Sequence, residues 1–171
     1  VAEHADGAGI AEPTARLMSV LGTLFQAKSQ FADSEPLNRR ALAIDERSYG
    51  PDHPEVATDL ANLASLLQAT NRLREAEPLV RRALAIDEQS YGPDHPKVAA
   101  ALNNLASLLQ STKRRGEAQP LYRRALAIDE RSYGAEHPNV ARDLNNLAAL
   151  LQATNRLAEA EPLMARVVTI F

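Results

Sequence analysis

The chain repeats itself with a period of 42 residues, and this repetition constrains the fold more than any other feature of the sequence. When the sequence is shifted by 42 positions, Pro54–His95 aligns with Pro96–His137 with 29 of 42 positions identical. The phrase Arg-Arg-Ala-Leu-Ala-Ile-Asp-Glu occurs three times, beginning at Arg39, Arg81 and Arg123. Self-similarity at a fixed period of this size is typical of repeat arrays, in which each unit stacks on its neighbours.

Within one unit, apolar residues recur at helical spacing in two stretches. The first stretch contains Val98, Leu102, Leu105, Ala106 and Leu109, and the second contains Ala118, Leu121, Tyr122, Ala125 and Ile128. Spacings of three and four residues place each set on one face of an α-helix. Pro96 suits the first turn of the first helix, a polar turn follows up to Gly116, and Gly134 suits the left-handed stop of the second helix. Each unit is therefore predicted to be a pair of helices.

We expect four such units after a flexible lead-in over residues 1–12. The units span about residues 13–53, 54–95, 96–137 and 138–171, and residues 13–171 form one elongated domain. The first unit is the most divergent, which is typical of a terminal unit that caps an array. The last unit ends in the apolar run Val167–Phe171 without a helix-ending glycine. We therefore expect the natural protein to continue, and this end to pack on further helices or to contact another molecule.

The pattern of small and large residues resembles the tetratricopeptide repeat. The residues at its signature positions are Leu102, Leu105, Ala106, Leu109, Ala118, Tyr122 and Ala125. Those repeats usually have about 34 residues, and this 42-residue version, with its Leu-Asn-Asn-Leu-Ala and Tyr-Arg-Arg-Ala-Leu phrases, resembles the kinesin light chain-type repeat. The resemblance covers about residues 13–171. It implies an all-α, right-handed α-solenoid (superhelix) of four helix-turn-helix units, whose first helices line a concave face.

The same resemblance implies a peptide-binding groove on that face, in which asparagines hold a cargo peptide. Asn103 and Asn145 would be the main ligands, because an amide can pair with both the N–H and the C=O of an extended peptide. Asn62, Asn104 and Asn146 stand beside them, and their alternative role is to satisfy buried backbone groups between helices. The other residues expected at the groove are Ser107, Gln68, Gln110, Gln152 and Arg142. The first unit would contribute Arg16, Ser19, Thr23, Gln26 and Ala27, and the second would contribute Thr58.

Three histidines, His53, His95 and His137, occupy equivalent positions, each directly before a proline. A zinc ion needs imidazole nitrogens at about 2.0–2.1 Å, whereas equivalent positions in packed helices are at least about 8–10 Å apart. We therefore expect these histidines to cap helices, and we expect no metal and no cofactor. The sequence contains no catalytic or nucleotide-binding motif, so we expect no enzyme activity.

The amino-acid composition argues against nucleic acid as a partner and against a membrane-spanning segment. The chain has 171 residues, a net charge of −3, 4% aromatic residues and no cysteine. Such a chain lacks the basic patches and stacking platforms that nucleic acid requires. It also lacks the run of roughly 18 apolar residues that a membrane span needs and the pattern of a signal peptide. The absence of cysteine fits a reducing, cytoplasmic compartment.

Two functions from different classes remain open. The first is a protein-interaction scaffold that binds a peptide segment of a partner in the concave groove. Arg72, Arg114 and Arg156, at the edge of the helix turns, would favour an acidic segment. The alternative is a structural module that forms homo-oligomers through its apolar C-terminal end.

Overall fold

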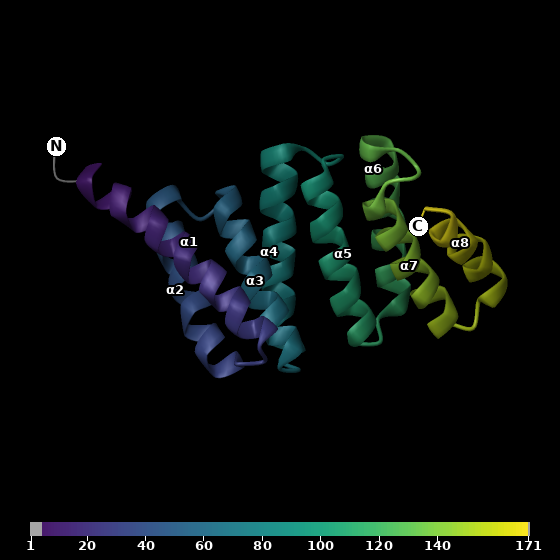
Figure 1. Cartoon of the computed structure of the whole chain (residues 1–171), viewed down its shortest axis with the longest axis horizontal. Coiled ribbons are helices and arrows are strands. Elements are labelled where there is room, and N and C mark those ends of the chain that lie inside the picture. The colour runs from purple at the N-terminus through teal and green to yellow at the C-terminus, as the bar shows by residue number, and fades with distance from the viewer. Residues whose placement is uncertain (1–4, 171) are drawn as a thin grey trace. The chain divides into compact units, whose positions relative to one another are not determined.

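The structure, a computed structural model, describes residues 5–170, in which all regular secondary structure is α-helical (Figure 1). The eight helices are α1 (Ala5–Ala27), α2 (Phe31–Tyr49), α3 (Pro54–Ala69), α4 (Leu73–Tyr91), α5 (Pro96–Ser111), α6 (Arg115–Tyr133), α7 (Pro138–Ala153) and α8 (Leu157–Ile170). They follow the sequence as four pairs, which confirms the predicted all-α class and the helix-pair unit. The chain divides into two compact units, Val1–Ser90 with α1–α4 and Tyr91–Phe171 with α5–α8. We call them unit 1 and unit 2.

Histidine caps three of the first helices, as the sequence predicted. The Nδ1 atoms of His53, His95 and His137 accept a hydrogen bond from the backbone N–H two residues ahead, at 3.1–3.2 Å. This bond satisfies one of the N–H groups that have no partner inside a helix. Each imidazole also stacks on the tyrosine that closes the preceding helix, for example Tyr49 on His53 with ring centroids 4.4 Å apart. The loop between pairs is thus fixed at both of its ends.

The turn inside each pair is tighter than the sequence suggested. Its middle residue has a positive φ, and these residues are Ser29, Asn71, Lys113 and Asn155. In α5/α6 the turn closes through a bond from Arg114 N–H to Leu109 O at 2.8 Å. Gly116, predicted to end the turn, instead lies in the first turn of α6. The turn itself was predicted, but its left-handed residue was not, because that residue is not a glycine in any of the four copies.

Glycine ends the second helices, but not in the left-handed helical conformation that was expected. Gly50 and Gly134 have φ of 92° and 87° with ψ of 160°. This extended region at positive φ is essentially restricted to glycine. Glycine is thus required here, as predicted, but for an extended conformation at positive φ and not for the left-handed helical one.

The first helix begins earlier than predicted. Residues 1–4 lie outside the described part of the chain, and α1 begins at Ala5, so the expected flexible lead-in is helical from that residue. Pro13, expected in the first turn, lies inside α1. A proline removes one hydrogen bond from a helix interior, so it disfavours a helix without excluding one.

Within each unit, the second helix of one pair packs against the first helix of the next, α2 against α3 and α6 against α7. In unit 1 the shared core contains Val56, Ala57, Leu60, Ala83 and Ile86, with Leu42 and Leu79 packed against them. Burying a leucine or valine side chain stabilises a fold by roughly 1.5–3 kcal/mol. This core joins α3 to α2 and α4 and so positions α3, whose other face lines the candidate site.

Candidate functional site

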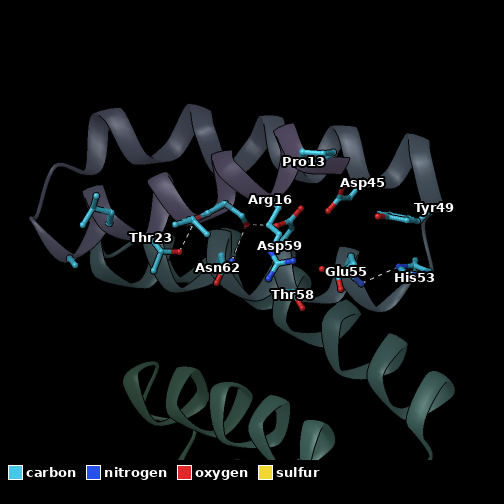
Figure 2. A pocket seen from close by; sticks show the side chains of 14 residues that line it. Pro13, Arg16, Thr23, Asp45, Tyr49, His53, Glu55, Thr58, Asp59 and Asn62 are labelled. Atoms are coloured by element: carbon cyan, nitrogen blue, oxygen red, sulfur yellow. Dashed lines mark hydrogen bonds between the residues drawn. The ribbon is translucent and has the colours of Figure 1, made fainter. Parts of the chain in front are cut away.

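A cleft of about 930 Å³ lies on unit 1, on the side of α1 and α3 (Figure 2). We call it the unit 1 cleft. The side chains that line it are Pro13, Arg16, Ser19, Val20, Thr23, Leu24, Ala27, Asp45, Tyr49, His53, Glu55, Thr58, Asp59 and Asn62. Four of the five groove residues expected from the first unit are among them, as are Thr58 and Asn62. The wall on α1 is apolar, because Val20 and Leu24 are 59% and 47% exposed.

Two carboxyl groups, Asp45 from α2 and Asp59 from α3, lie in the lining of the unit 1 cleft (Figure 2). Asp59 is 3% exposed, and its Oδ1 accepts a hydrogen bond of 2.6 Å from Ser19 Oγ. Asn62 Nδ2 donates to the same Ser19 Oγ at 3.2 Å. Asp59 Oδ2 is buried and accepts no hydrogen bond from the described residues. Burial, and then the nearby Asp45 carboxylate, raise the pKa of Asp59 to about 7 against the opposing hydrogen bond from Ser19.

Unit 2 contains the same pair of acids 84 positions later. Asp129 and Asp143 are 1% and 0% exposed. Arg142 Nη2 donates to Asp129 Oδ2 at 3.2 Å and to Asp143 Oδ1 at 3.0 Å, and its Nε reaches Asp143 Oδ1 at 3.1 Å. Burial and the neighbouring Asp143 carboxylate raise the pKa of Asp129 to about 6, while Arg142 opposes the shift. Here a guanidinium of the chain itself covers the acid pair.

The expected main ligand Asn103 is not available to a peptide in this structure. It is only 8% exposed, and its Nδ2 donates to Asp143 Oδ1 at 2.8 Å. Its Oδ1 accepts from Asn146 Nδ2 at 3.4 Å. The prediction that Asn103 points into an open groove is therefore wrong, because a buried carboxylate on the next first helix binds the amide. Asn104, its neighbour, is exposed instead.

The remaining asparagines divide between surface and interior. Asn145 is exposed on α7, as expected of a groove residue. Asn146 and Asn62 are half-buried, and they donate to the side chains of Asn103 and Ser19. The alternative role proposed for them, between packed helices, thus fits these two, although the groups they bond are side chains rather than backbone.

The other expected groove residues vary in exposure. Ser107 and Gln152 are exposed, and Gln68 is half-buried. Gln110 is half-buried, and its Oε1 accepts from the Tyr122 hydroxyl at 3.2 Å. Arg142 keeps 46% of its side chain exposed while it covers the acid pair.

A profile of the tetratricopeptide repeat matches residues 13–89, 61–131 and 97–171, which together cover most of the sequence. The chain belongs to the tetratricopeptide repeat family. Among curated proteins, none matches the sequence significantly.

Solved structures of tetratricopeptide repeat-like proteins resemble the chain closely. BtubC (BKLC) from P. vanneervenii is 25% identical with a TM-score of 0.82, over 91% of this chain and 62% of that one. A putative kinesin light chain from Podospora anserina, with nearly identical TPR-like repeats, is 26% identical with a TM-score of 0.74, over 91% and 74%. A Rap protein complexed with Competence and Sporulation Factor is 17% identical with a TM-score of 0.79, over 91% and 42%, and shows the fold alone. The chain thus spans about three fifths of BtubC and two fifths of the Rap protein.

The arginines at the turns of these tetratricopeptide units are engaged by carboxylates of the chain. Arg72 bonds Glu75 and Glu35, each at 2.7 Å. Arg114 and Arg156 make the corresponding bonds to glutamates three residues ahead, at 2.6–2.7 Å. Their pairing removes the reason to expect an acidic segment at this edge. The sequence showed the charges but not their partners.

A second hollow, of about 540 Å³, lies on α8, and we call it the α8 surface. It is lined by Gln152, Leu157, Ala160, Glu161, Met164, Ala165 and Val168. Leu157 and Val168 are 59% and 76% exposed. Phe171, part of the apolar end noted in the sequence, lies outside the described residues.

Two kinds of feature are absent from residues 5–170. No helix of this part of the chain has the length and hydropathy to cross a membrane. Within the same residues, no three His, Cys, Asp or Glu side chains form a group that could hold a metal ion.

Proposed function

We propose that the chain is a protein-interaction module that binds an extended peptide segment of a partner along its first helices, with the unit 1 cleft as the main site. The observation that carries the proposal is the cleft itself, since it is large enough for several peptide side chains and combines an apolar wall with polar groups. Val20 and Leu24 would bury apolar side chains of the peptide. Thr58 and Asn62 would pair with its backbone.

Membership of the tetratricopeptide repeat family supports this proposal, because such repeats generally serve protein interaction. The Rap protein of the same fold, complexed with Competence and Sporulation Factor, shows that the fold can hold another molecule. In unit 2, the exposed Asn104 and Asn145 would contact the partner through their amides. Nothing in the described residues resembles a catalytic constellation, and we propose no reaction.

A peptide-display selection against the full chain tests the proposal. We expect enrichment of related peptides, and we expect Val20→Glu to weaken the binding of a selected peptide about tenfold, because a carboxylate would replace the apolar wall. Leu17→Glu is the matched control, since Leu17 is also 59% exposed on α1 but does not line the cleft. Both variants are compared at a concentration at which the wild type is monomeric, because Leu17 also belongs to the self-association surface proposed below. Selection of no peptide, or equal effects of the two variants, would contradict the proposal.

A second function, self-association, is supported by the α8 surface. Val168 stands 126 positions, or three units, after Leu42, and Leu42 packs against the core of α3. The α8 surface is therefore built like the surface that receives a first helix inside the chain. Helix α1 offers the complementary part, because Leu17 and Leu24 stand one unit before Asp59 and Leu66, which α3 buries. We propose α1 of a second copy as the occupant, and sedimentation of wild type against Val168→Glu tests it.

A further inference from the structure

The two acid pairs are copies of one site, and the groups around them differ. Asp45 and Asp59 of unit 1 correspond to Asp129 and Asp143 of unit 2, at a shift of 84 positions. Arg142, which covers the pair in unit 2, corresponds to Thr58 in unit 1. Thr58 is exposed, and its hydroxyl donates only to the backbone oxygen of Pro54, at 3.3 Å. The chain supplies a guanidinium to one acid pair and none at the equivalent position of the other.

The geometry of unit 2 shows how the site binds a guanidinium. One nitrogen of Arg142 bridges the two carboxyl groups, and a second nitrogen holds Asp143. In unit 1, where position 58 is a threonine, Asp45 and Asp59 are 6% and 3% exposed, so a bound guanidinium would add attraction while burying little further acid surface. A planar guanidinium also offers several donors in fixed directions, which a lysine ammonium does not.

In unit 1 the corresponding carboxyl groups border the open cleft. Asp143 Oδ1 in unit 2 accepts from both Asn103 and Arg142, whereas its counterpart Asp59 Oδ1 accepts from Ser19. The other oxygen, Oδ2, has no hydrogen-bond partner among the described residues in either Asp59 or Asp143. The charged and titratable side chains that surround the pair in the cleft are Arg16 from α1, Tyr49 from α2, and His53 and Glu55 at the beginning of α3. Arg16 is exposed to solvent, and within residues 5–170 it forms no hydrogen bond or ion pair. Glu55 adds a negative charge that raises the pKa of Asp59 further.

We infer that the unit 1 cleft binds the guanidinium group of an arginine in the partner peptide, against Asp45 and Asp59, at the place that Arg142 occupies in unit 2. This inference rests on the proposed peptide-binding function and specifies one residue of the peptide. It also reverses the expectation of an acidic segment, because the carboxylates of the cleft outnumber its single arginine. The raised pKa of Asp59 agrees with it, since Asp59 lacks the guanidinium that lowers the pKa of its counterpart Asp143 against the effect of burial.

The inference is tested by an NMR titration of the full chain with N-acetyl-arginine methylamide. N-acetyl-citrulline methylamide, which has nearly the same shape but no charge, is the reference compound. We expect the arginine compound to bind at least about tenfold more tightly than the citrulline compound, because a charge-assisted bond to a buried carboxylate replaces a neutral one. The amide signals of Ser19, Asp59 and Asn62 should shift.

Two variants locate the binding. Asp59→Asn keeps the shape of the side chain and should remove the preference for arginine over citrulline. Thr58→Arg should supply a guanidinium from the chain itself, as in unit 2, and should abolish binding of the arginine compound. The matched control is Ala69→Arg, which adds the same charge to the same exposed face of α3, about three turns away. This control should bind the arginine compound as the wild type does.

Equal affinity for arginine and citrulline would overturn the inference, as would arginine binding that survives both Asp59→Asn and Thr58→Arg. The amide spectra of the variants show whether each has folded, and Thr58→Arg changes only an exposed position. Failure here is distinguishable from failure of the proposed function. Peptides selected without arginine, and sensitive to Val20→Glu, would leave the peptide site in place and reject its arginine specificity.

Discussion

The buried aspartates make the stability of the protein depend on pH in a specific direction. The pKa of Asp59 is raised from 3.8 to about 7, and that of Asp129 from 3.8 to about 6. A carboxyl with a raised native pKa stabilises the fold fully below its unfolded pKa, and this contribution is lost as pH rises through the native value. Arginines lower the pKa values of Glu35, Glu75 and Glu159 instead, so their contribution is lost only as pH falls below about 4.5.

Between pH 5 and pH 8 the aspartates should therefore dominate the pH dependence. We expect the free energy of unfolding to fall by roughly 1–3 kcal/mol across this range, on the scale of about 1.4 kcal/mol per pKa unit. Chemical denaturation followed by circular dichroism at pH 5, 6, 7 and 8 measures it. Asp59→Asn should flatten the dependence, because the amide cannot ionise. A stability that rises from pH 5 to pH 8 in both proteins would reject this account.

The glycine at the end of each second helix is a second site where one residue decides stability. Gly134 has φ of 87° and ψ of 160°, although a Cβ there would meet no atom within 4 Å. Gly134→Ala should thus destabilise the fold by about 1–3 kcal/mol through backbone strain alone. Gly116 is the control, since it lies exposed inside α6 with equal space. Gly116→Ala should stabilise by about 0.5–1 kcal/mol, and the same sign for both variants in denaturant melts would refute the argument.

At the scale of elements, the contact of α1 with α2 differs from the equivalent contacts of the other pairs at two residues, Gly22 and Asn38. Gly22 stands where the other units have Ala64, Ala106 and Ala148, and a Cβ on it would collide with Oδ1 of Asn38. Asn38 is 1% exposed, and its Oδ1 accepts no hydrogen bond from the described residues. The glycine and the asparagine are therefore coupled, and changing either alone disturbs the packing.

Exchange of both residues for those of the next pair tests this coupling. Gly22→Ala alone should destabilise by about 1–3 kcal/mol, because the methyl group overpacks a filled site. Asn38→Val alone removes the buried amide but leaves a gap beside Gly22. The double variant reproduces the Ala64 and Val80 combination of α3 and α4, and we expect it to be at least as stable as the wild type. A double-mutant cycle by chemical denaturation measures the coupling, and additive effects would show that the two positions are independent.

The helices could be predicted from the sequence, but the hydrogen-bond partners of their polar side chains could not. The apolar stripes and the His-Pro beginnings placed the helices after the first within a few residues, because spacing and capping are local properties. Helical periodicity predicts which face a residue occupies but not what it meets there. Asn103 was therefore assigned to a groove, although Asp143, 40 residues later, holds its amide. The hydrogen bond from Arg142 to Asp129 could not be predicted for the same reason.

At the scale of the whole molecule, the proposed contact between copies joins two unlike surfaces, α8 of one copy and α1 of the next. Val168 of the α8 surface is 76% exposed at the position of Leu42, and Leu17 of α1 is 59% exposed at the position of Asp59. A contact between unlike surfaces is heterologous, so a dimer still has one unoccupied surface of each kind and further copies can add to it. We expect wild type to form species of increasing size as its concentration rises, and sedimentation velocity measures them.

Two end-blocked variants distinguish this contact from a symmetric dimer. Val168→Glu and Leu17→Glu should each be monomeric alone, because a charge is buried at one side of every contact. Their equimolar mixture should nevertheless form dimers and nothing larger, since each supplies the surface that the other lacks. In a symmetric contact through α8 alone, Leu17→Glu would associate as the wild type does, and Val168→Glu would not be rescued by mixing. Dimers in the mixture would therefore establish both the occupant and the direction of assembly.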